Sequence, residues 1–295
     1  MRLLNKTNID FINRKQYAIF ISSVVIIVGM ISLFIKGGPP LSIDFTGGTI
    51  VQIKFDEAVE IRQIRQEMDQ HGFENPQIIN FGNPSEILIK LQYLGSNSDL
   101  SDNLDKALEK KFDLRRIESV GPKIGKELQT DAIYAILLAL ILILIYITFR
   151  FDRNYALGSM IALIHDILIT LSIFTFFNYE IDLSIIAAFL TIVGYSLNDT
   201  IVLFDRIREN VPKLIKDSLV NIVNISINET LSRTVITSLT TLIVLFILYL
   251  MGGEVIKLFA FALLVGVLAG TYSSIFIASP AMIYFETKKI SNKKQ

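Results

Sequence analysis

Six long apolar stretches constrain the fold of this chain more than any other feature of its sequence. Each is long enough for a helix to cross the hydrocarbon core of a bilayer. They lie at residues 17–35, 132–149, 156–177, 183–204, 235–251 and 255–285. Because 52% of the residues are hydrophobic and only 19% are charged, one soluble core cannot bury all of these stretches. The sequence therefore predicts a polytopic α-helical membrane protein with six transmembrane helices, the last five within residues 131–285.

The first apolar stretch has a cleavable signal peptide as its alternative interpretation. Small residues at a cleavage site should then follow it, and Gly37-Gly38-Pro39-Pro40 does not provide them. We therefore interpret residues 1–36 as a cytoplasmic N-terminus followed by an uncleaved transmembrane helix.

Residues 37–130 have the pattern of a soluble α+β domain between the first and second helices. Apolar residues alternate at 50–55 and 86–93, as they do in strands with one buried face. Helical spacing at 57–70 and 100–108, with two further short strands, gives the order β-α-β-β-α-β. This order predicts a small α+β domain of the ferredoxin-like type.

The basic residues of the membrane region are concentrated in every second connector and at the end of the chain. They are Arg150, Arg153, Arg206, Arg208, Lys213, Lys216, Arg233, Lys288, Lys289, Lys293 and Lys294. The opposite connectors, 178–182 and 252–254, carry acids and no base, and Lys257 just beyond them is the exception. The positive-inside rule therefore predicts that both termini, including the basic tail 286–295, are cytoplasmic and that residues 37–130 are extracytoplasmic.

The segment near 210–230 combines apolar residues at helical spacing with interspersed charges. It is too polar for a clean membrane span and too regular for a disordered loop. We expect an amphipathic segment that lies along the cytoplasmic face of the membrane.

Asp199 is the first candidate functional residue, because it lies inside an apolar helix. A carboxylate at the centre of a membrane helix costs about 2.5–3.5 kcal/mol on insertion scales, so it needs a partner or a function. Arg233 opens the next helix from the same side, and an antiparallel helix pair would allow an ion pair between the two side chains. Such a carboxyl group could change its protonation state and couple to an ion gradient. The alternatives are a structural hydrogen bond for Asp199 and a membrane-surface anchor for Arg233.

His165 and Asp166 form a second polar pair, inside the third apolar stretch. Histidine titrates near neutral pH, so the pair could relay protons or hold water. A satisfied structural pair in the bundle interior is an equally good interpretation. No ligand-spaced carboxylates accompany His165, and we expect no metal site.

Several function classes have no support in the sequence. Lys and Arg number 28, as do Asp and Glu, so no charge excess indicates a nucleic-acid partner. The absence of cysteine excludes disulfides and thiol nucleophiles. Phosphate-binding loops, nucleophile elbows and metalloprotease motifs are also absent, so we expect neither an enzyme nor a cofactor.

Three motifs together identify a resemblance to a known family. They are Asp44-Phe45-Thr46-Gly47-Gly48, Leu163-Ile164-His165-Asp166, and the run GYSLNDTIVLFDRIREN at 194–210. The chain closely resembles the SecD/SecF family of protein-export membrane proteins over nearly its whole length. The glycine pair alone would be a weak signal, since it also fits a simple turn or bulge, whereas the long third motif is specific.

The resemblance implies a relative of the resistance-nodulation-division transporters, in which SecD and a smaller partner each supply six helices to one bundle. It matches Asp199 and Arg233 with an intramembrane acid and base that respond to proton flow. The polar residues that would support them are Asn198, Thr200, His165 and Asp166, and the structural loop is Thr46, Gly47 and Gly48.

The implied function is that of an accessory subunit that uses the proton motive force to promote export and release of polypeptides. The implied location is the bacterial cytoplasmic (inner) membrane. The implied partners are SecD, the translocon proteins SecY, SecE and SecG, YajC and YidC, the exported polypeptide and the lipid bilayer. Two other functions fit the buried charges: a small-solute or drug exporter of the same superfamily, and a membrane scaffold. The single small exterior domain disfavours the exporter.

Overall fold

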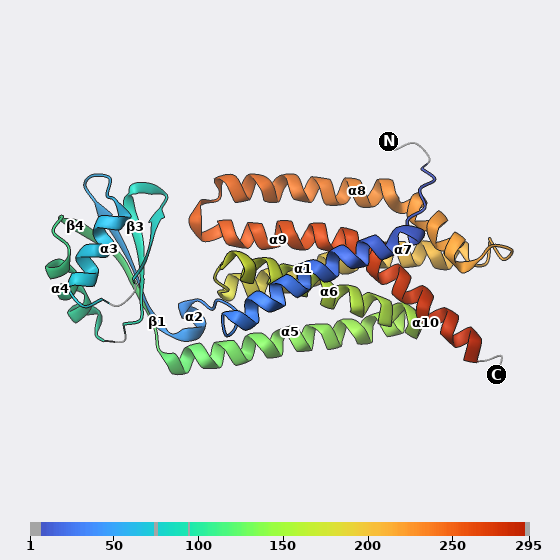
Figure 1. Ribbon diagram of the computed structural model, residues 1–295, viewed down its shortest axis with the longest axis horizontal. Coiled ribbons are helices and arrows are strands. Elements are labelled where there is room, and N and C mark those ends of the chain that lie inside the picture. Colours follow the sequence, from blue (N-terminus) through green and yellow to red (C-terminus); the bar gives the residue numbers. More distant parts are fainter. Residues whose placement is uncertain (1–6, 74–75, 94, 293–295) are drawn as a thin grey trace.

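Six membrane-length helices form a long bundle, with a small sheet domain at one end (Figure 1). This computed structural model describes residues 7–73, 76–93 and 95–292. Lys293 and Lys294 of the expected basic tail lie outside the described residues. We call the end of the bundle next to the sheet domain the domain end, and the opposite end, near both termini, the terminal end (Figure 1).

The spanning helices agree with the six apolar stretches, with some differences at their ends. They are α1 (Lys15–Ile35), α5 (Pro122–Arg150), α6 (Arg153–Phe177), α7 (Leu183–Asn210), α8 (Leu219–Met251) and a last span made of α9 (Gly253–Ser273), a π-helical turn (Ser274–Ala278) and α10 (Ser279–Asn292). A short 3-10 turn, η1 (Ile12–Arg14), precedes α1. The polytopic membrane fold predicted from the sequence is confirmed.

Three spans form the interior of the bundle, and the other three lie at its periphery. In the most apolar window of each span, 44% of the residues are buried in α6, 50% in α7 and 56% in the last span, against 17% in α1, 6% in α5 and 17% in α8. Asp166 on α6 and Asp199 on α7 therefore belong to the interior helices.

Glycine allows α9 to lie unusually close to α7. A Cβ atom on Gly266 would lie 2.2 Å from Ile192, and one on Gly270 would lie 2.8 Å from the Cβ of Ser196. Real Cβ atoms essentially never come so close to other atoms. The two glycines are four residues apart, the spacing that brings helix backbones together in membranes.

The sheet domain has the predicted strand and helix order. Its elements are β1 (Gly48–Phe55), α3 (Ile61–Gln70), β2 (Gln77–Phe81), β3 (Asn83–Leu91), α4 (Asn97–Ala107) and β4 (Phe112–Val120). The strands pair antiparallel in the order β2-β3-β1-β4. The alternation expected at residues 50–55 is present, because Val51, Ile53 and Phe55 are at most 2% exposed and pack with Ile64 of α3 and Leu100 of α4. This is the small α+β domain expected between the first two spans.

The predicted loop Thr46-Gly47-Gly48 forms the joint between the sheet domain and the bundle. It ends the short helix α2 (Ile43–Thr46) and leads into β1. Gly47 has φ +81°, and a Cβ atom there would lie 2.9 Å from the Cα of Pro122, at the start of α5. Gly48 has φ +144° and lies against the carbonyl oxygen of Leu91, 2.6 Å from where its Cβ would be. Only glycine combines these dihedral angles with such close contacts.

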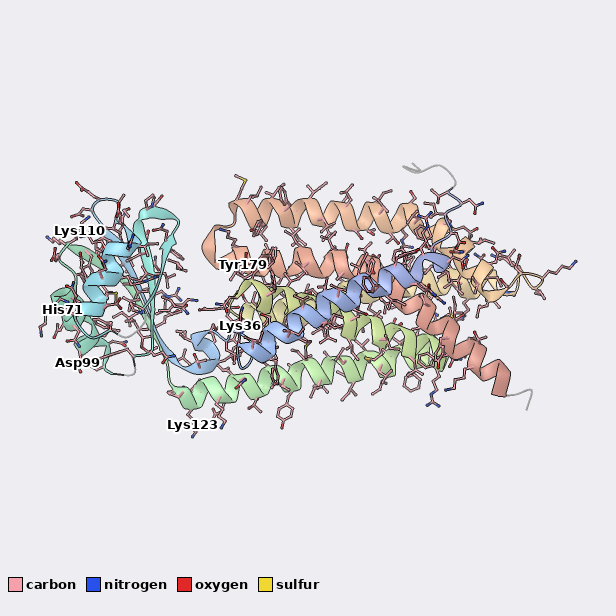
Figure 2. The ribbon with its side chains drawn as sticks, in the orientation of Figure 1. Lys36, His71, Asp99, Lys110, Lys123 and Tyr179 are labelled. Carbon is pink, nitrogen blue, oxygen red and sulfur yellow. The ribbon has the colours of Figure 1, made fainter. Side chains whose placement is uncertain are left out.

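Polar contacts join the same region to the bundle. Asp44 accepts a hydrogen bond from the backbone N–H of Leu183 at the start of α7, with an Oδ2–N distance of 3.1 Å. Lys90 of β3 forms an ion pair with Glu180, in the connector between α6 and α7. Figure 2 shows Lys36 and Tyr179 at the domain end of the bundle and Lys123 at the start of α5. The sheet domain is therefore attached by side-chain contacts as well as by its two chain connections.

The structure corrects the expected amphipathic segment near 210–230. Residues 211–218 form turns, and α8 begins at Leu219 and continues without a break to Met251. The Ser218 side chain caps this start by accepting from the N–H of Asn221, at 3.2 Å. The apolar residues Val223 and Ile227 pack in the bundle core. Their helical spacing therefore belongs to the first turns of α8, which pack on the bundle, and not to a separate helix.

Candidate functional site

Asp199 is buried among three helices and meets hydroxyl groups. It is 4% exposed and lies on α7, 16 residues or ~24 Å after Leu183 at the domain end. Ser238 of α8 donates to its Oδ2 at 3.4 Å. Ser238 Oγ also lies 2.7 Å from Oγ1 of Thr271 on α9. The carboxyl group thus joins α7, α8 and α9 through neutral partners.

Arg233 lies near enough to Asp199 for its charge to act on the carboxyl group, but the two side chains form no direct ion pair in the described structure. Among the described residues, no ion pair joins the two side chains, and Arg233 is exposed on the outside of α8. Arg233 precedes Ser238, the residue of α8 that contacts Asp199, by five positions. Because each residue turns a helix by about 100°, Arg233 lies about 140° away around the axis of α8.

The two neighbours of Asp199 in the sequence have different environments. Asn198 is exposed on the outer face of α7. Thr200 is buried and donates to the backbone carbonyl of Ser196, at 3.2 Å. Neither makes a hydrogen bond to Asp199 in the described structure. Their supporting role therefore stays a prediction.

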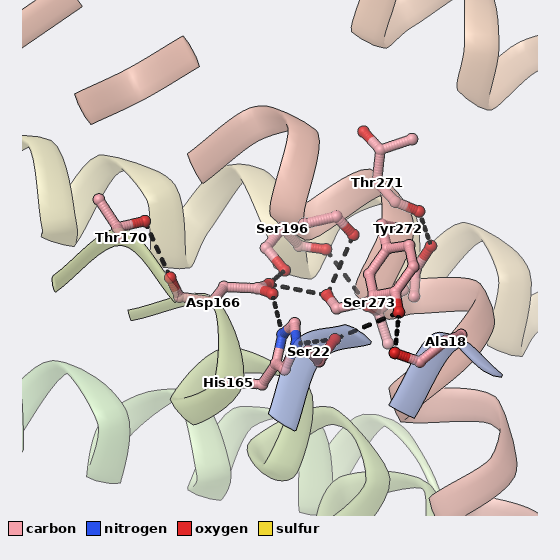
Figure 3. Close-up of polar contacts among 12 residues, drawn as sticks. Ala18, Ser22, His165, Asp166, Thr170, Ser196, Thr271, Tyr272 and Ser273 are labelled. Atoms are coloured by element: carbon pink, nitrogen blue, oxygen red, sulfur yellow. Dashed lines mark hydrogen bonds and ion pairs between the residues drawn. The ribbon is translucent and has the colours of Figure 1, made fainter. Parts of the chain in front are cut away.

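Asp166 is the second buried carboxyl group, and it has three hydrogen-bond donors (Figure 3). It is 0% exposed. Ser196 of α7 and Ser273 of α9 donate to its Oδ2, at 2.5 and 2.8 Å. His165 Nδ1 lies 2.8 Å from its Oδ1. Asp166 therefore connects α6 to both other interior spans.

His165 continues this network to α1 (Figure 3). Its Nε2 lies 2.9 Å from Oγ of Ser22. Ser22 Oγ lies 3.2 Å from the hydroxyl of Tyr272, which donates to the carbonyl of Ala18 at 2.5 Å. The predicted pair is thus one part of a hydrogen-bond network that crosses α1, α6, α7 and α9.

The two carboxyl sites are neighbours in the bundle. Ser196 of the Asp166 site precedes Asp199 by one helical turn on α7, and Thr271 of the Asp199 site is two residues from Ser273 on α9. In the part of the chain that the structure describes, no side-chain hydrogen bond links the two sites. The contact of Gly270 with Ser196 lies between them.

The last part of the long motif, at the terminal end of α7, makes ion pairs. Arg150 donates to both carboxylate oxygens of Asp205, at 3.0 and 2.9 Å. Arg206 donates to Glu229 of α8, and Asn210 donates to the same carboxylate, both at 2.7 Å. These residues fix the terminal ends of α5, α7 and α8 relative to one another.

The sequence did not single out the hydroxyl residues that surround the acids. They are Ser22, Ser196, Ser238, Thr271 and Ser273. Their only signal is that each is a small polar residue within an apolar stretch. Such residues often hydrogen-bond between membrane helices, but the sequence does not show which helices are neighbours. Within the described residues, no group of three or more His, Asp or Glu side chains forms a candidate metal site.

Two family descriptions match the chain. "Protein export membrane protein SecD/SecF, C-terminal" matches residues 100–288, and "SecD/SecF GG Motif" matches residues 31–59. The chain is also similar to the protein translocase subunit SecF of Desulfurispirillum indicum. The two are 43% identical over 293 residues, which cover 96% of this chain and 93% of that protein.

Solved structures of a larger protein share the fold. SecDF of Thermus thermophilus, titled a translocon-associated membrane protein, is 38% identical, and the match has a TM-score of 0.87 and covers 97% of this chain. A structure of SecDF in a super-membrane-facing form has a TM-score of 0.74 at 36% identity, and all of this chain is covered. The chain spans only 40% of the first SecDF chain and 41% of the second.

Proposed function

This chain belongs to the SecD/SecF family of protein-export membrane proteins, and we propose that it is an accessory subunit of the Sec protein translocase. In this proposal it acts with SecD, uses the proton motive force, and promotes export and release of polypeptides without catalysing a reaction. The chain spans 40% of SecDF, which supports a SecD part as the source of the other half.

The observation that carries the proposal is the environment of Asp199 together with the position of Arg233. The Asp199 carboxyl group is buried among hydroxyls and forms no direct ion pair within the described residues, so a charge there is costly and the group needs a function. The exposed Arg233 lies 18 residues, or ~27 Å, before the end of α8 at Met251. That places it inside or at the edge of a 30 Å hydrocarbon core, where a charge needs a protein partner.

The outer face of α7 beside Asp199 has the residues of a contact surface for a partner helix. Ala187, Thr191, Gly194 and Asn198 are exposed at successive helical turns. A Cβ atom on Gly194 would meet nothing within 4 Å. Small and polar residues on a membrane-facing surface are typical of helix contacts. We assign this face to SecD, whose helices would cover Asn198 and approach Arg233.

The distribution of charges supports one orientation in the membrane. Arg150, Arg153, Arg206 and Lys216 lie at the terminal end of the bundle, whereas the connector 178–182 at the domain end carries acids. Under the positive-inside rule, the terminal end with both termini is cytoplasmic and the sheet domain is extracytoplasmic. The sheet domain would therefore meet the exported polypeptide, while the bundle would adjoin SecY, SecE and SecG in the bacterial inner membrane. YajC and YidC are further partners in this proposal.

Asp199→Asn tests the proposed coupling, because asparagine keeps the size and cannot bind or release the proton. The variant, its SecD partner and the translocon would be reconstituted in vesicles, and export would be measured with and without an imposed proton gradient. We expect gradient-stimulated export to fall to the level seen without a gradient. Glu209→Gln, an exposed acid on the same helix, is the matched control, and export should keep its gradient dependence. Unchanged stimulation in Asp199→Asn would reduce this residue to a packing role.

Cysteine labelling tests the orientation, since the chain has no cysteine of its own. Ser96 caps the start of α4 in the sheet domain and Ser218 caps the start of α8 at the terminal end, and both are exposed. Single cysteines at these positions should react with an impermeant thiol reagent from opposite sides of sealed vesicles. Labelling of both from one side would overturn the topology.

A further inference from the structure

The His165–Asp166 pair is an ionisable group in the bundle core that the proposed role of Asp199 leaves unused. Asp166 receives hydrogen bonds from Ser196 and Ser273 as well as from His165. Three donors around one carboxyl group fit its ionised form, which accepts and does not donate. With a neutral imidazole, the pair then carries one negative charge at about the middle of α6, a costly position inside a membrane.

One additional proton would remove this charge. The pair would then consist of an imidazolium and a carboxylate, with no net charge and with the Nδ1–H to Oδ1 hydrogen bond unchanged. An ion pair with good geometry is the arrangement that best offsets desolvation in a buried site.

The hydrogen-bond network on the other side of the ring accommodates both forms. When His165 is neutral with its proton on Nδ1, Ser22 donates to Nε2 across the 2.9 Å contact. When His165 is protonated, Nε2–H donates to Ser22 Oγ. Ser22 then donates to the Tyr272 hydroxyl at 3.2 Å, and Tyr272 already donates to the carbonyl of Ala18. Rotation of one hydroxyl therefore satisfies every group in either state.

A pocket adjoins the pair and extends along α1 toward the terminal end of the bundle. It has a volume of about 550 Å³ and lies between α1, α6 and α10. Ser22 and His165 form part of its wall, and Lys15 and Tyr284 line it nearer the terminal end. The titratable groups around the pair are Lys15 on α1, Tyr272 on α9 and Tyr284 on α10, with Asp199 one turn beyond Ser196 on α7.

We propose that the His165–Asp166 pair is a second proton-binding site of the membrane bundle, filled through the cavity between α1, α6 and α10 and distinct from Asp199. Uptake transfers a proton from a hydronium ion in the cavity to Nε2 of His165 and leaves water. One N–H bond forms, no electrons are transferred, and the charge of the pair changes from −1 to 0. The site can be occupied whether or not Asp199 couples export to a gradient, so the two assignments fail separately.

NMR of nitrogen-labelled histidine tests the site directly, because the chain has only two histidines. His71→Gln removes the one in the sheet domain and leaves the ring of His165 as the sole signal. In lipid nanodiscs, the His165 signal should change reversibly between its neutral and protonated forms from about pH 9 to about pH 5. Asp166→Asn, which lacks the charge that the proton neutralises, should abolish this transition, whereas Asp199→Asn should leave it in place.

Two other variants keep the test decisive if Asp166→Asn does not fold. Ser22→Ala removes the acceptor of the protonated form and should also weaken the transition. A cysteine at Ser23, which lines the cavity, should react with a small water-soluble thiol reagent. A His165 signal that stays in one form over the whole range would overturn the proposal. So would a transition that is unchanged in Asp166→Asn or Ser22→Ala, or an unreactive cysteine at position 23.

Discussion

Gly270 of α9 lies against Ser196 of α7, so closely that a Cβ atom on Gly270 would stand 2.8 Å from the Cβ of Ser196. Ser196 at the same time donates to Asp166, at 2.5 Å. The distance between two helix backbones and one hydrogen bond of a buried carboxyl group therefore depend on the same contact.

Gly270→Val should therefore destabilise the bundle. The added side chain would force α7 and α9 apart, and overpacking of this kind costs about 1–3 kcal/mol. Separation of the helices would also lengthen the hydrogen bonds of Asp166. Thermal unfolding in detergent measures the loss. Gly194→Val on the outer face of α7, where a Cβ meets nothing within 4 Å, is the matched control and should unfold close to the wild-type temperature. Equal losses in the two variants would contradict the contact as the cause.

Gly47→Ala should weaken the joint between the sheet domain and the bundle. Alanine at φ +81° incurs a backbone cost of about 1–2 kcal/mol, and its Cβ would also stand 2.9 Å from Pro122. Gly72→Ala has nearly the same dihedral angle, φ +85°, and no atom within 4 Å of its Cβ. The difference between the two variants in unfolding temperature and in protease cleavage at residues 41–48 isolates the contact with α5. If Gly47→Ala cost no more than Gly72→Ala, the close packing would be unimportant.

Lys90→Met should loosen the sheet domain without unfolding it. The ion pair with Glu180 is partly exposed, with side-chain exposures of 23% and 21%, so its contribution is about 1 kcal/mol or less. Spin labels on cysteines at Asn103 and Met251 would report the distance between the two parts. We expect a broader distance distribution in Lys90→Met. Arg116→Gln breaks an exposed ion pair within β4 and should leave the distribution unchanged. A narrow distribution in Lys90→Met would mean that the glycine joint alone holds the domain.

Acid should release the N-terminal segment from α8. The hydrogen bond from the Asn224 side chain, and then those from Asn13, lower the pKa of Asp10 below its ordinary value. A carboxyl group whose pKa is lower in the folded state contributes stability above its unfolded pKa, and loses it as pH falls through the folded value. Attachment of residues 9–12 should therefore weaken below about pH 4.

Amide hydrogen exchange at Phe11 and Ile12 measures this attachment, because both N–H groups donate to Asn224 Oδ1, at 3.0 and 3.1 Å. Exchange should accelerate on acidification beyond its intrinsic pH dependence. In Asp10→Asn the additional acceleration should disappear. Its persistence in that variant would assign the effect to another acid.

Much of the fold could be predicted from the sequence because it depends on local periodicity. The alternation of Val51, Ile53 and Phe55 shows which face of β1 is buried, and spans of membrane length require no knowledge of their neighbours. The segment 210–230 shows what local periodicity cannot predict. Its apolar residues have the same spacing whether the helix lies on the membrane or continues into it. The contacts of Asn224 and Asn228 with residues 9–12 that fix its position join distant parts of the chain.

The acids of the candidate site could be predicted from the sequence, but the residues that hydrogen-bond to them could not. The cost of a buried charge identifies Asp199 and Asp166 from sequence alone. Their contacts depend on which helices are adjacent and on the rotation of each about its axis. Arg233 lies on the expected helix and on the wrong side of it for a contact with Asp199, whereas Ser238 lies on the side that makes the contact.

The long helix α5 starts at Pro122, directly after Gly121 and the end of β4, and runs for 29 residues to Arg150. It is the least buried of the spans, so little of its surface is held by the other helices. A rotation of the sheet domain would therefore rotate α5 about its own axis. This rotation would reach the opposite end of α5, where Arg150 forms an ion pair with Asp205. Asp205 lies on α7, the helix that carries Asp199.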